Sequence, residues 1–102
     1  MHTSDTLTLG LAQLAPVWLN REQTLDKMLS YAQDAVTQGC DLVVFGEALL
    51  PGYPFWLELT DGARFNSQVQ KEIHAHYMAN AVCLEHGHLD PLCTLAKQHQ
   101  LA

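Results

Sequence analysis

Positively charged residues are scarce in this chain. Its 102 residues include five Lys and Arg against eleven Asp and Glu, which gives a formal net charge of −6. Nucleic acids and anionic membrane surfaces attract basic patches, so this charge balance argues against both. Long apolar runs are also missing, because no segment approaches the ~20 apolar residues of a membrane-spanning helix. The sequence therefore predicts neither a nucleic-acid partner nor a membrane partner.

The chain contains few cysteines, and their number is odd. Three cysteines fit reduced thiols better than a framework of disulfides. Residues 1–5 contain no basic stretch that leads into an apolar one, so they do not signal secretion. Both features favour a cytoplasmic protein. The remaining composition, 48% apolar and 16% charged, is typical of one globular domain rather than a disordered chain.

The first part of the chain has the pattern of a strand followed by an amphipathic helix. Leucines alternate within residues 7–14, which predicts a strand that ends before Pro16. Asn20, with Gln23 three residues later, has the arrangement of a helix N-cap, and Gly39 suits the left-handed residue that closes a helix. The apolar residues that recur at helical spacing are Leu25, Met28, Leu29, Ala32, Ala35 and Val36. The opposite face carries Arg21, Glu22, Asp26, Lys27, Gln33 and Asp34.

A second strand is predicted at residues 42–45, where Leu-Val-Val-Phe fits a strand that is buried on both faces. Strand, helix and strand together form a βαβ unit, whose two strands run parallel. Residues 57–59 fit a short helical turn, and residues 67–84 fit a longer helix. A last helix is predicted from Asp90, with Asp90 as its N-cap and Pro91 at its first position. The predicted fold class is α/β, a βαβ unit followed by two helices.

Glu47 lies just beyond the second predicted strand. In open α/β sheets, ligands bind outside the carboxyl ends of the strands. The tail Pro51-Gly52-Tyr53-Pro54 cannot continue a strand, because proline lacks an N–H and glycine favours a positive φ. A carboxylate in such an apolar setting loses hydration and becomes a stronger base, so we predict that Glu47 is a general base. The alternative is an ordinary polar residue that begins a loop.

Three aromatic residues, Tyr53, Phe55 and Trp56, follow this carboxylate. They either line a substrate pocket beside Glu47 or pack the turn onto the sheet, and the sequence favours neither reading. The next stretch, residues 57–71, fits an active-site lid or an oligomer contact equally well.

Residues 45–56, Phe-Gly-Glu-Ala-Leu-Leu-Pro-Gly-Tyr-Pro-Phe-Trp, resemble the glutamate motif of the nitrilase superfamily of carbon–nitrogen hydrolases. The Pro-Gly-Tyr-Pro-Phe-Trp tail is most similar to the nitrilase branch. The resemblance implies an α-β-β-α sandwich in a longer domain, of which residues 1–102 form the N-terminal portion. It also implies a homo-oligomer in the full-length protein and no cofactor.

Members of this superfamily use a Cys, a Glu and a Lys. The resemblance implies that a cysteine thiolate attacks the carbon of a small-molecule nitrile, or of an amide in sister branches, while Glu47 moves protons and a lysine stabilises the developing negative charge. Ammonia leaves, and water then releases the acid from a thioester. Only Glu47 matches a family motif here. The residues that match neither the cysteine nor the lysine motif are Cys40, Cys83, Cys93, Lys27, Lys71 and Lys97.

Other readings stay open. An aliphatic amidase or N-carbamoyl hydrolase of the same superfamily is the alternative enzyme. A truncated, non-catalytic chain is another, because two parallel strands alone leave sheet edges and an apolar face open. We therefore expect residues 1–102 to be a fragment that is inactive alone, and Leu101 and Ala102 to lie where a next strand begins.

A small zinc module is the last alternative. Cysteine and histidine lie close together in the stretch Cys83-x2-His86-x-His88-x4-Cys93. These spacings fit no common zinc pattern. We therefore expect solvated or capping histidines and no metal.

Overall fold

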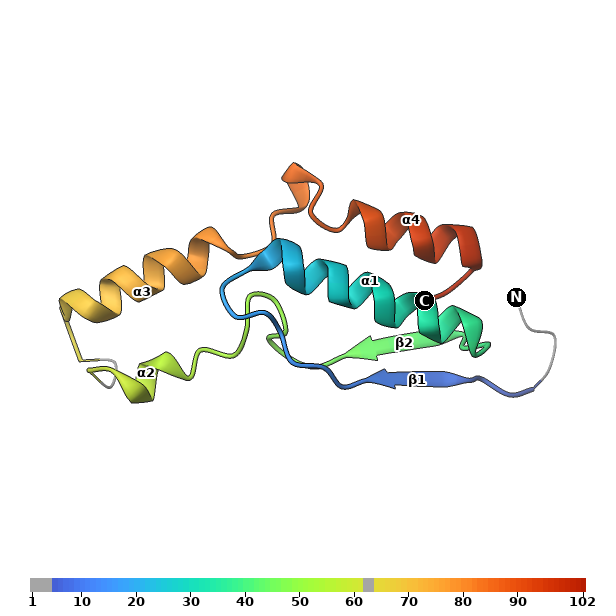
Figure 1. Ribbon diagram of the computed structural model, residues 1–102, viewed down its shortest axis with the longest axis horizontal. Coiled ribbons are helices and arrows are strands. Elements are labelled where there is room, and N and C mark those ends of the chain that lie inside the picture. The colour runs from blue at the N-terminus through green and yellow to red at the C-terminus, as the bar shows by residue number, and fades with distance from the viewer. Residues whose placement is uncertain (1–4, 62–63) are drawn as a thin grey trace.

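The computed structural model describes residues 5–61 and 64–102 and arranges them as a small sheet with helices on one side (Figure 1). The elements are β1 (Leu9–Ala12), α1 (Arg21–Thr37), β2 (Leu42–Phe45), α2 (Trp56–Leu59), α3 (Gln68–Ala79), the 3-10 turn η1 (Leu84–His86) and α4 (Asp90–His99). The molecule is elongated, with extents of 56 × 25 × 18 Å, because α2 and α3 extend away from the sheet (Figure 1).

β1 and β2 pair in parallel, with Leu9 opposite Leu42 and Ala12 opposite Phe45. This pairing confirms the predicted βαβ unit and the α/β class. The first strand is shorter than the predicted residues 7–14. Its ladder can only be as long as its partner, which also has four residues.

The second edge of β2 is paired by the last residues of the chain. The Val43 N–H donates to the Ala102 carbonyl oxygen at 2.9 Å, and the Ala102 N–H donates to the Asp41 carbonyl oxygen at 2.9 Å. Ala102 thus bonds to Asp41 and Val43, the residues on either side of Leu42, which is the hydrogen-bond pattern of a parallel pair. Ala102 therefore pairs with β2 as a parallel neighbour would, and β2 has hydrogen-bonding partners on both edges.

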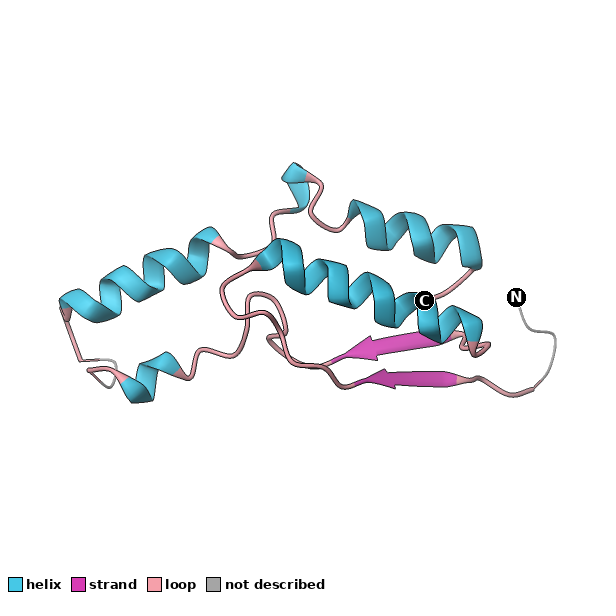
Figure 2. Cartoon of the chain, in the orientation of Figure 1, coloured by secondary structure: helices cyan, strands magenta, loops and turns pink. Residues whose placement is uncertain are grey.

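α1 covers one face of the sheet (Figure 2). Its N-cap is Asn20, whose side chain accepts a hydrogen bond from the Gln23 N–H at 3.0 Å, and Gly39 follows its end with a φ of +77°. Both predicted helix boundaries are therefore confirmed. The buried residues of this helix are Thr24, Met28, Ala32 and Ala35.

Thr24 is the one polar residue of this buried set, and the hydrophobic pattern did not place it there. It is fully buried. Its hydroxyl accepts a hydrogen bond from the Val17 N–H at 2.9 Å and donates to the Val17 carbonyl oxygen at 3.1 Å. Because both polar groups of Val17 are satisfied in this way, the buried hydroxyl fastens the loop after β1 to the first turns of α1.

α4 lies beside α1 on the same side of the sheet (Figure 1). The predicted cap at Asp90 is wrong by one position, because Asp90 is the first helical residue and Leu89 is the N-cap, with no side-chain hydrogen bond. The Asp90 N–H instead donates to the Gly87 carbonyl oxygen at 3.1 Å. The backbone turn at Gly87 therefore starts the helix, and the Asp90 carboxylate still lies at its positive end.

The opposite face of the sheet is bare. A Cβ on Gly10 would lie 3.8 Å from the Ala35 Cβ of α1, so the even positions of β1 face that helix. The odd positions face away, and Leu9 and Leu11 are 48% and 71% exposed. Val44 pairs with Leu11 and is 44% exposed. One apolar face of this sheet is therefore left without a covering layer among the described residues.

α2 confirms the predicted helical turn, but the longer helix is shorter than predicted. Ser67 is the N-cap of α3, at the start of the predicted range, but the helix ends at Ala79 rather than at the end of the predicted range 67–84. The backbone carbonyls of Ala79 and Ala81 both turn toward the Arg21 side chain at the start of α1. The helix thus stops at its C-cap, Asn80, where Arg21 holds the carbonyls on either side.

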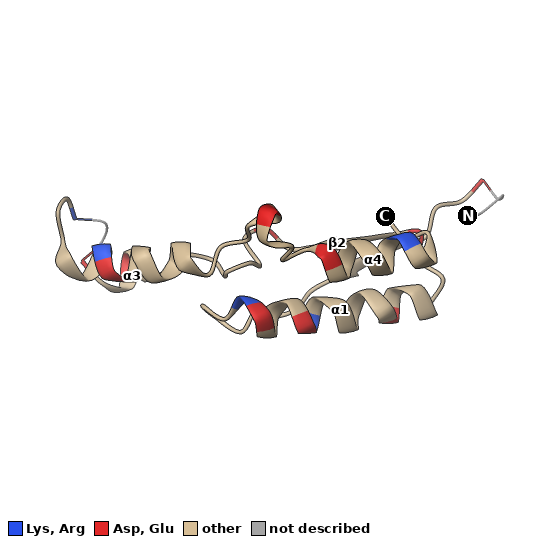
Figure 3. Ribbon diagram, turned by 90° about the horizontal axis from the view of Figure 1, so that it is seen from above, with Lys and Arg blue, Asp and Glu red and all other residues tan. Residues whose placement is uncertain are grey.

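Charged residues are spread over the helices. Figure 3 shows the acidic residues distributed along α1, α3 and α4 rather than gathered in one patch. In the parts of the chain that the structure describes, no helix has the length and apolar character needed to cross a membrane.

Candidate functional site

Glu47 begins a turn that follows β2. Gly46 separates it from the strand, and residues 47–51 form the turn. The side chain is exposed, whereas Leu49, Pro51 and Gly52 of the same turn are buried. The turn therefore packs its later residues inward and leaves the carboxylate outside, at the carboxyl end of the sheet.

The turn has an unusual backbone. Ala48 has a φ of +58°, Gly52 has a φ of +124°, and the Leu50–Pro51 peptide bond is cis. The Gly52 N–H donates to the Ala48 carbonyl oxygen at 3.0 Å and closes the turn. This closure fixes the backbone of the residue that directly follows Glu47.

Gly52 is the point where three segments of the chain meet. A Cβ at this position would lie 2.5 Å from Cδ1 of Trp18, which comes from the loop after β1. The neighbouring Leu19 N–H donates to the Pro51 carbonyl oxygen at 3.3 Å. From the other side, the Tyr77 hydroxyl of α3 donates to the Gly52 carbonyl oxygen at 2.9 Å. The loop after β1 and helix α3 therefore both hold the turn that carries Glu47.

The three predicted pocket aromatics lie in different surroundings. Tyr53 is 66% exposed. Phe55 is 46% exposed and stacks on Trp18 with ring centroids 5.0 Å apart. Trp56 is 4% exposed and meets the ring of Tyr77 edge-on at 5.9 Å. Tyr53 and Phe55 thus remain accessible beside the turn, whereas Trp56 packs against α3; their role as pocket residues stays a prediction.

An open groove lies next to the turn, at the carboxyl ends of both strands. Its volume is about 440 Å³. The residues that line it are Leu11, Ala12, Gln13, Leu14, Val44, Phe45 and Gly46. The groove is mostly apolar and reaches Gly46, the residue that precedes Glu47.

The three cysteines and Lys27 belong to other parts of the fold than the turn that carries Glu47. Cys40 precedes β2, so it lies at the end of the strand opposite to Glu47. Cys83 precedes η1, and Cys93 is exposed on α4. Lys27 of α1 donates to the Ala15 carbonyl oxygen. Cys40 is therefore separated from Glu47 by the length of β2, whereas Cys83, Cys93 and Lys27 lie on or beside helices.

The late histidines form local contacts. Nδ1 of His88 accepts a hydrogen bond from the Cys83 N–H at 2.8 Å, which makes this histidine a capping group. The rings of His86 and His88 meet edge-on with centroids 5.6 Å apart. Within residues 5–61 and 64–102, no three His, Cys, Asp or Glu side chains gather as metal ligands would.

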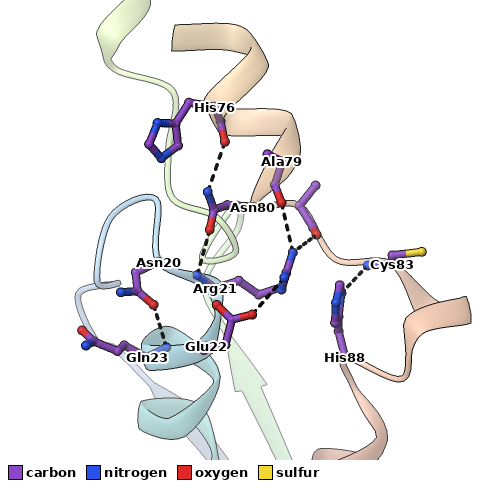
Figure 4. Close-up of polar contacts among 10 residues, drawn as sticks. Asn20, Arg21, Glu22, Gln23, His76, Ala79, Asn80, Cys83 and His88 are labelled. Carbon is purple, nitrogen blue, oxygen red and sulfur yellow. Dashed lines mark hydrogen bonds and ion pairs between the residues drawn. The ribbon is translucent and has the colours of Figure 1, made fainter. Parts of the chain in front are cut away.

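Arg21 forms a contact that the sequence did not reveal (Figure 4). Its guanidinium donates to the carbonyl oxygens of Ala79 at 3.2 Å and Ala81 at 3.0 Å, and its backbone N–H donates to Oδ1 of Asn80 at 3.4 Å. It was predicted on the solvated face of the helix. The first residue of α1 instead holds the last turn of α3.

Glu22 completes this contact. A guanidinium nitrogen of Arg21 donates to Oε1 of Glu22 at 2.9 Å. The pKa of Glu22 is lowered, first by a hydrogen bond from its own backbone and second by Arg21. The ion pair is at the surface, so its effect on stability is small.

The sequence profile of the family described as "Carbon-nitrogen hydrolase" matches residues 8–102, so the chain belongs to this family. The match confirms the resemblance drawn from residues 45–56 and is consistent with the N-terminal portion of a nitrilase-superfamily protein.

Named relatives point in the same direction. The chain is 36% identical over 92 residues to "Nitrilase 2" of an unknown prokaryotic organism, which covers 90% of this chain and 28% of that protein. It is 38% identical over 97 residues to "Nitrilase, arylacetone-specific" of Alcaligenes faecalis, and the aligned part covers 95% of this chain and 26% of that protein. It is 30% identical over 103 residues to "Aliphatic nitrilase" of Rhodococcus rhodochrous, and the aligned part covers 97% of this chain and 26% of that protein. The chain thus spans about a quarter of the length of these curated relatives.

Proposed function

We propose that this chain is the N-terminal portion of a nitrilase-type hydrolase that converts a nitrile into a carboxylic acid and ammonia, with Glu47 as the proton carrier. One observation carries the proposal: the carboxylate lies at the carboxyl end of a parallel strand, on a turn that two other segments hold in place. The names of its relatives, which are nitrilases, support the substrate class.

The proposed chemistry needs two further groups. A cysteine thiolate attacks the nitrile carbon, and the carbon–sulfur bond forms as the nitrogen takes a proton. Water adds to the same carbon, ammonia leaves, and a second water releases the acid and restores the thiol. Glu47 carries protons between water and the leaving nitrogen, and a lysine stabilises the negative charge. We propose that the cysteine and the lysine come from polypeptide outside residues 1–102.

The surroundings of Glu47 agree with a site that is completed by polypeptide outside residues 1–102. A general base gains strength when it is desolvated, yet the carboxylate is exposed among the described residues. The bare face of Leu9, Leu11 and Val44 is where the resemblance implies a second sheet of the sandwich. We propose that the same missing layer covers this face and closes the site around the carboxylate.

The test is Glu47→Gln in the complete protein that contains this chain. The substitution keeps shape and hydrogen bonding but removes the base, so ammonia release should fall by at least about 10²–10⁴-fold. Glu85→Gln, at an exposed position of η1, is the matched control and should leave the rate unchanged. Turnover near wild type in E47Q would end the assignment of Glu47.

The substrate panel of this assay should contain nitriles, amides and N-carbamoyl compounds. Preference for amides or N-carbamoyl compounds would identify the alternative enzyme, an aliphatic amidase or N-carbamoyl hydrolase. We expect preference for nitriles. We also propose a homo-oligomer for the complete protein and a cytoplasmic location, the second because the three cysteines are free thiols.

A further inference from the structure

Tyr77 is the residue of α3 that touches the Glu47 turn. Its hydroxyl donates to the Gly52 carbonyl oxygen at 2.9 Å, across 25 residues of sequence. Its ring packs edge-on against the buried ring of Trp56. The ring therefore belongs to the packing between α2 and α3, and the hydroxyl extends to the turn.

The hydroxyl acts on Glu47 through two backbone links. The Gly52 carbonyl that it holds belongs to the residue whose N–H donates to the Ala48 carbonyl oxygen at 3.0 Å. Ala48 directly follows Glu47 and has a left-handed backbone that needs external support. The orientation of Gly52 is therefore coupled through this hydrogen bond to Ala48, the residue next to Glu47.

α3 is itself held close to this contact. Arg21 donates two hydrogen bonds to the carbonyls of Ala79 and Ala81, just after Tyr77 (Figure 4). Asn80 adds a third link, since its Oδ1 accepts from the Arg21 N–H at 3.4 Å. The end of α3 is therefore fixed to the start of α1, and the Tyr77 hydroxyl extends from a fixed support.

We propose that Tyr77 is a positioning residue for the proton carrier, because its hydroxyl holds the Gly52 carbonyl and so fixes the orientation of the Glu47 turn. The inference rests on the proposed function of Glu47. The Leu19 N–H, at 3.3 Å from the Pro51 carbonyl oxygen, holds the preceding peptide unit. That unit also carries the Gly52 N–H that bonds Ala48, so Leu19 and Tyr77 hold two successive peptide units of the turn.

The experiment compares Tyr77→Phe with Tyr31→Phe in the complete protein. The first removes only the hydroxyl and keeps the ring against Trp56; the second removes the hydroxyl of a partly exposed tyrosine on α1. We expect kcat of Y77F to fall about 10- to 100-fold, the range between one lost hydrogen bond and a misplaced catalytic group. KM should change by less than about twofold, since substrate contacts remain. Y31F should match wild type.

A second readout does not depend on activity. Hydrogen exchange of the Gly52 amide should become about fivefold faster or more in Y77F, while the slow amides of α1 keep their rates. Local acceleration together with the loss of kcat supports the proposal. Unchanged exchange at Gly52, or faster exchange with full kcat, would overturn it. Faster exchange throughout α1 would also overturn it, because the hydroxyl would then serve general stability.

The two proposals fail in different ways. Full turnover in E47Q would remove the proposed role of Glu47, whatever Y77F shows. Loss of turnover in E47Q with full turnover in Y77F would keep that role and remove only the positioning role of Tyr77.

Discussion

Gly52→Ala is the sharpest test of the packing around the glutamate turn. The new Cβ would lie 2.5 Å from Cδ1 and 3.2 Å from Nε1 of Trp18. That ring is stacked on Phe55, with centroids 5.0 Å apart, so it cannot move aside without breaking a second contact. The glycine also has a φ of +124°, which a residue with a Cβ rarely adopts.

The size of the effect follows from these two causes. A non-glycine residue held in such a backbone region costs roughly 1–3 kcal/mol. Forcing an extra carbon into a filled site costs about another 1–3 kcal/mol. We therefore expect Gly52→Ala to lower the free energy of unfolding by about 2–6 kcal/mol.

Two other glycines separate the causes. Gly39 has a φ of +77° with open space around its missing Cβ, so Gly39→Ala should show the backbone cost alone, roughly 1–2 kcal/mol. Gly46 has open space and no such φ, so Gly46→Ala should lie within about 0.5 kcal/mol of wild type. Urea unfolding of the complete protein, followed by tryptophan fluorescence, measures all three.

The order of the three variants is the decisive result. If Gly52→Ala were no more destabilising than Gly39→Ala, Trp18 would not press on the turn. The packing of Trp18, from the loop after β1, against Gly52 would then be refuted. The Glu47 turn would lose one of the two segments proposed to hold it.

Three further outcomes are expected. Leu29 is half-buried on the apolar side of α1, so Leu29→Ala should cost about 1–2 kcal/mol, whereas exposed Gln33→Ala should stay within about 0.5 kcal/mol; equal effects in urea unfolding would mean that the helix faces are misassigned. Arg21→Met should loosen α3, so the amides of that helix should exchange faster while those of α1 keep their rates. Purified residues 1–102 should release no ammonia from nitriles or amides and should self-associate in size-exclusion chromatography, because an apolar sheet face is bare; steady turnover or a monodisperse monomer would contradict this.

Local chemistry was enough to predict the framework. The Asn20 cap and the left-handed Gly39 depend on hydrogen bonds and backbone preferences within a few residues, and both boundaries of α1 were found. The four residues of β2 were found in the same way, and so was the place of Glu47 at its carboxyl end, but the predicted burial of β2 on both faces is wrong, because Val44 is 44% exposed. These features are encoded by neighbours in the sequence.

Long-range contacts account for most of what was missed. The end of α3 is held by Arg21, some 58 residues earlier in the chain, and the pattern of α1 assigned that arginine to solvent. Thr24 is polar and was left out of the core, because its partner Val17 lies outside the helix. The surroundings of Trp56 likewise depend on a helix whose packing cannot be read from spacing.

The difference between local and long-range contacts also explains what the chain can contribute to catalysis. A general base must be both oriented and desolvated, and the two requirements are met by different parts of a protein. Orientation comes from contacts that hold the backbone of the turn, and here the Leu19 N–H and the Tyr77 hydroxyl make them. Desolvation needs an opposing wall, and Glu47 has none among the described residues. If the proposal holds, this portion of the hydrolase sets the direction of the carboxylate, and the polypeptide that covers the bare sheet face sets its strength as a base.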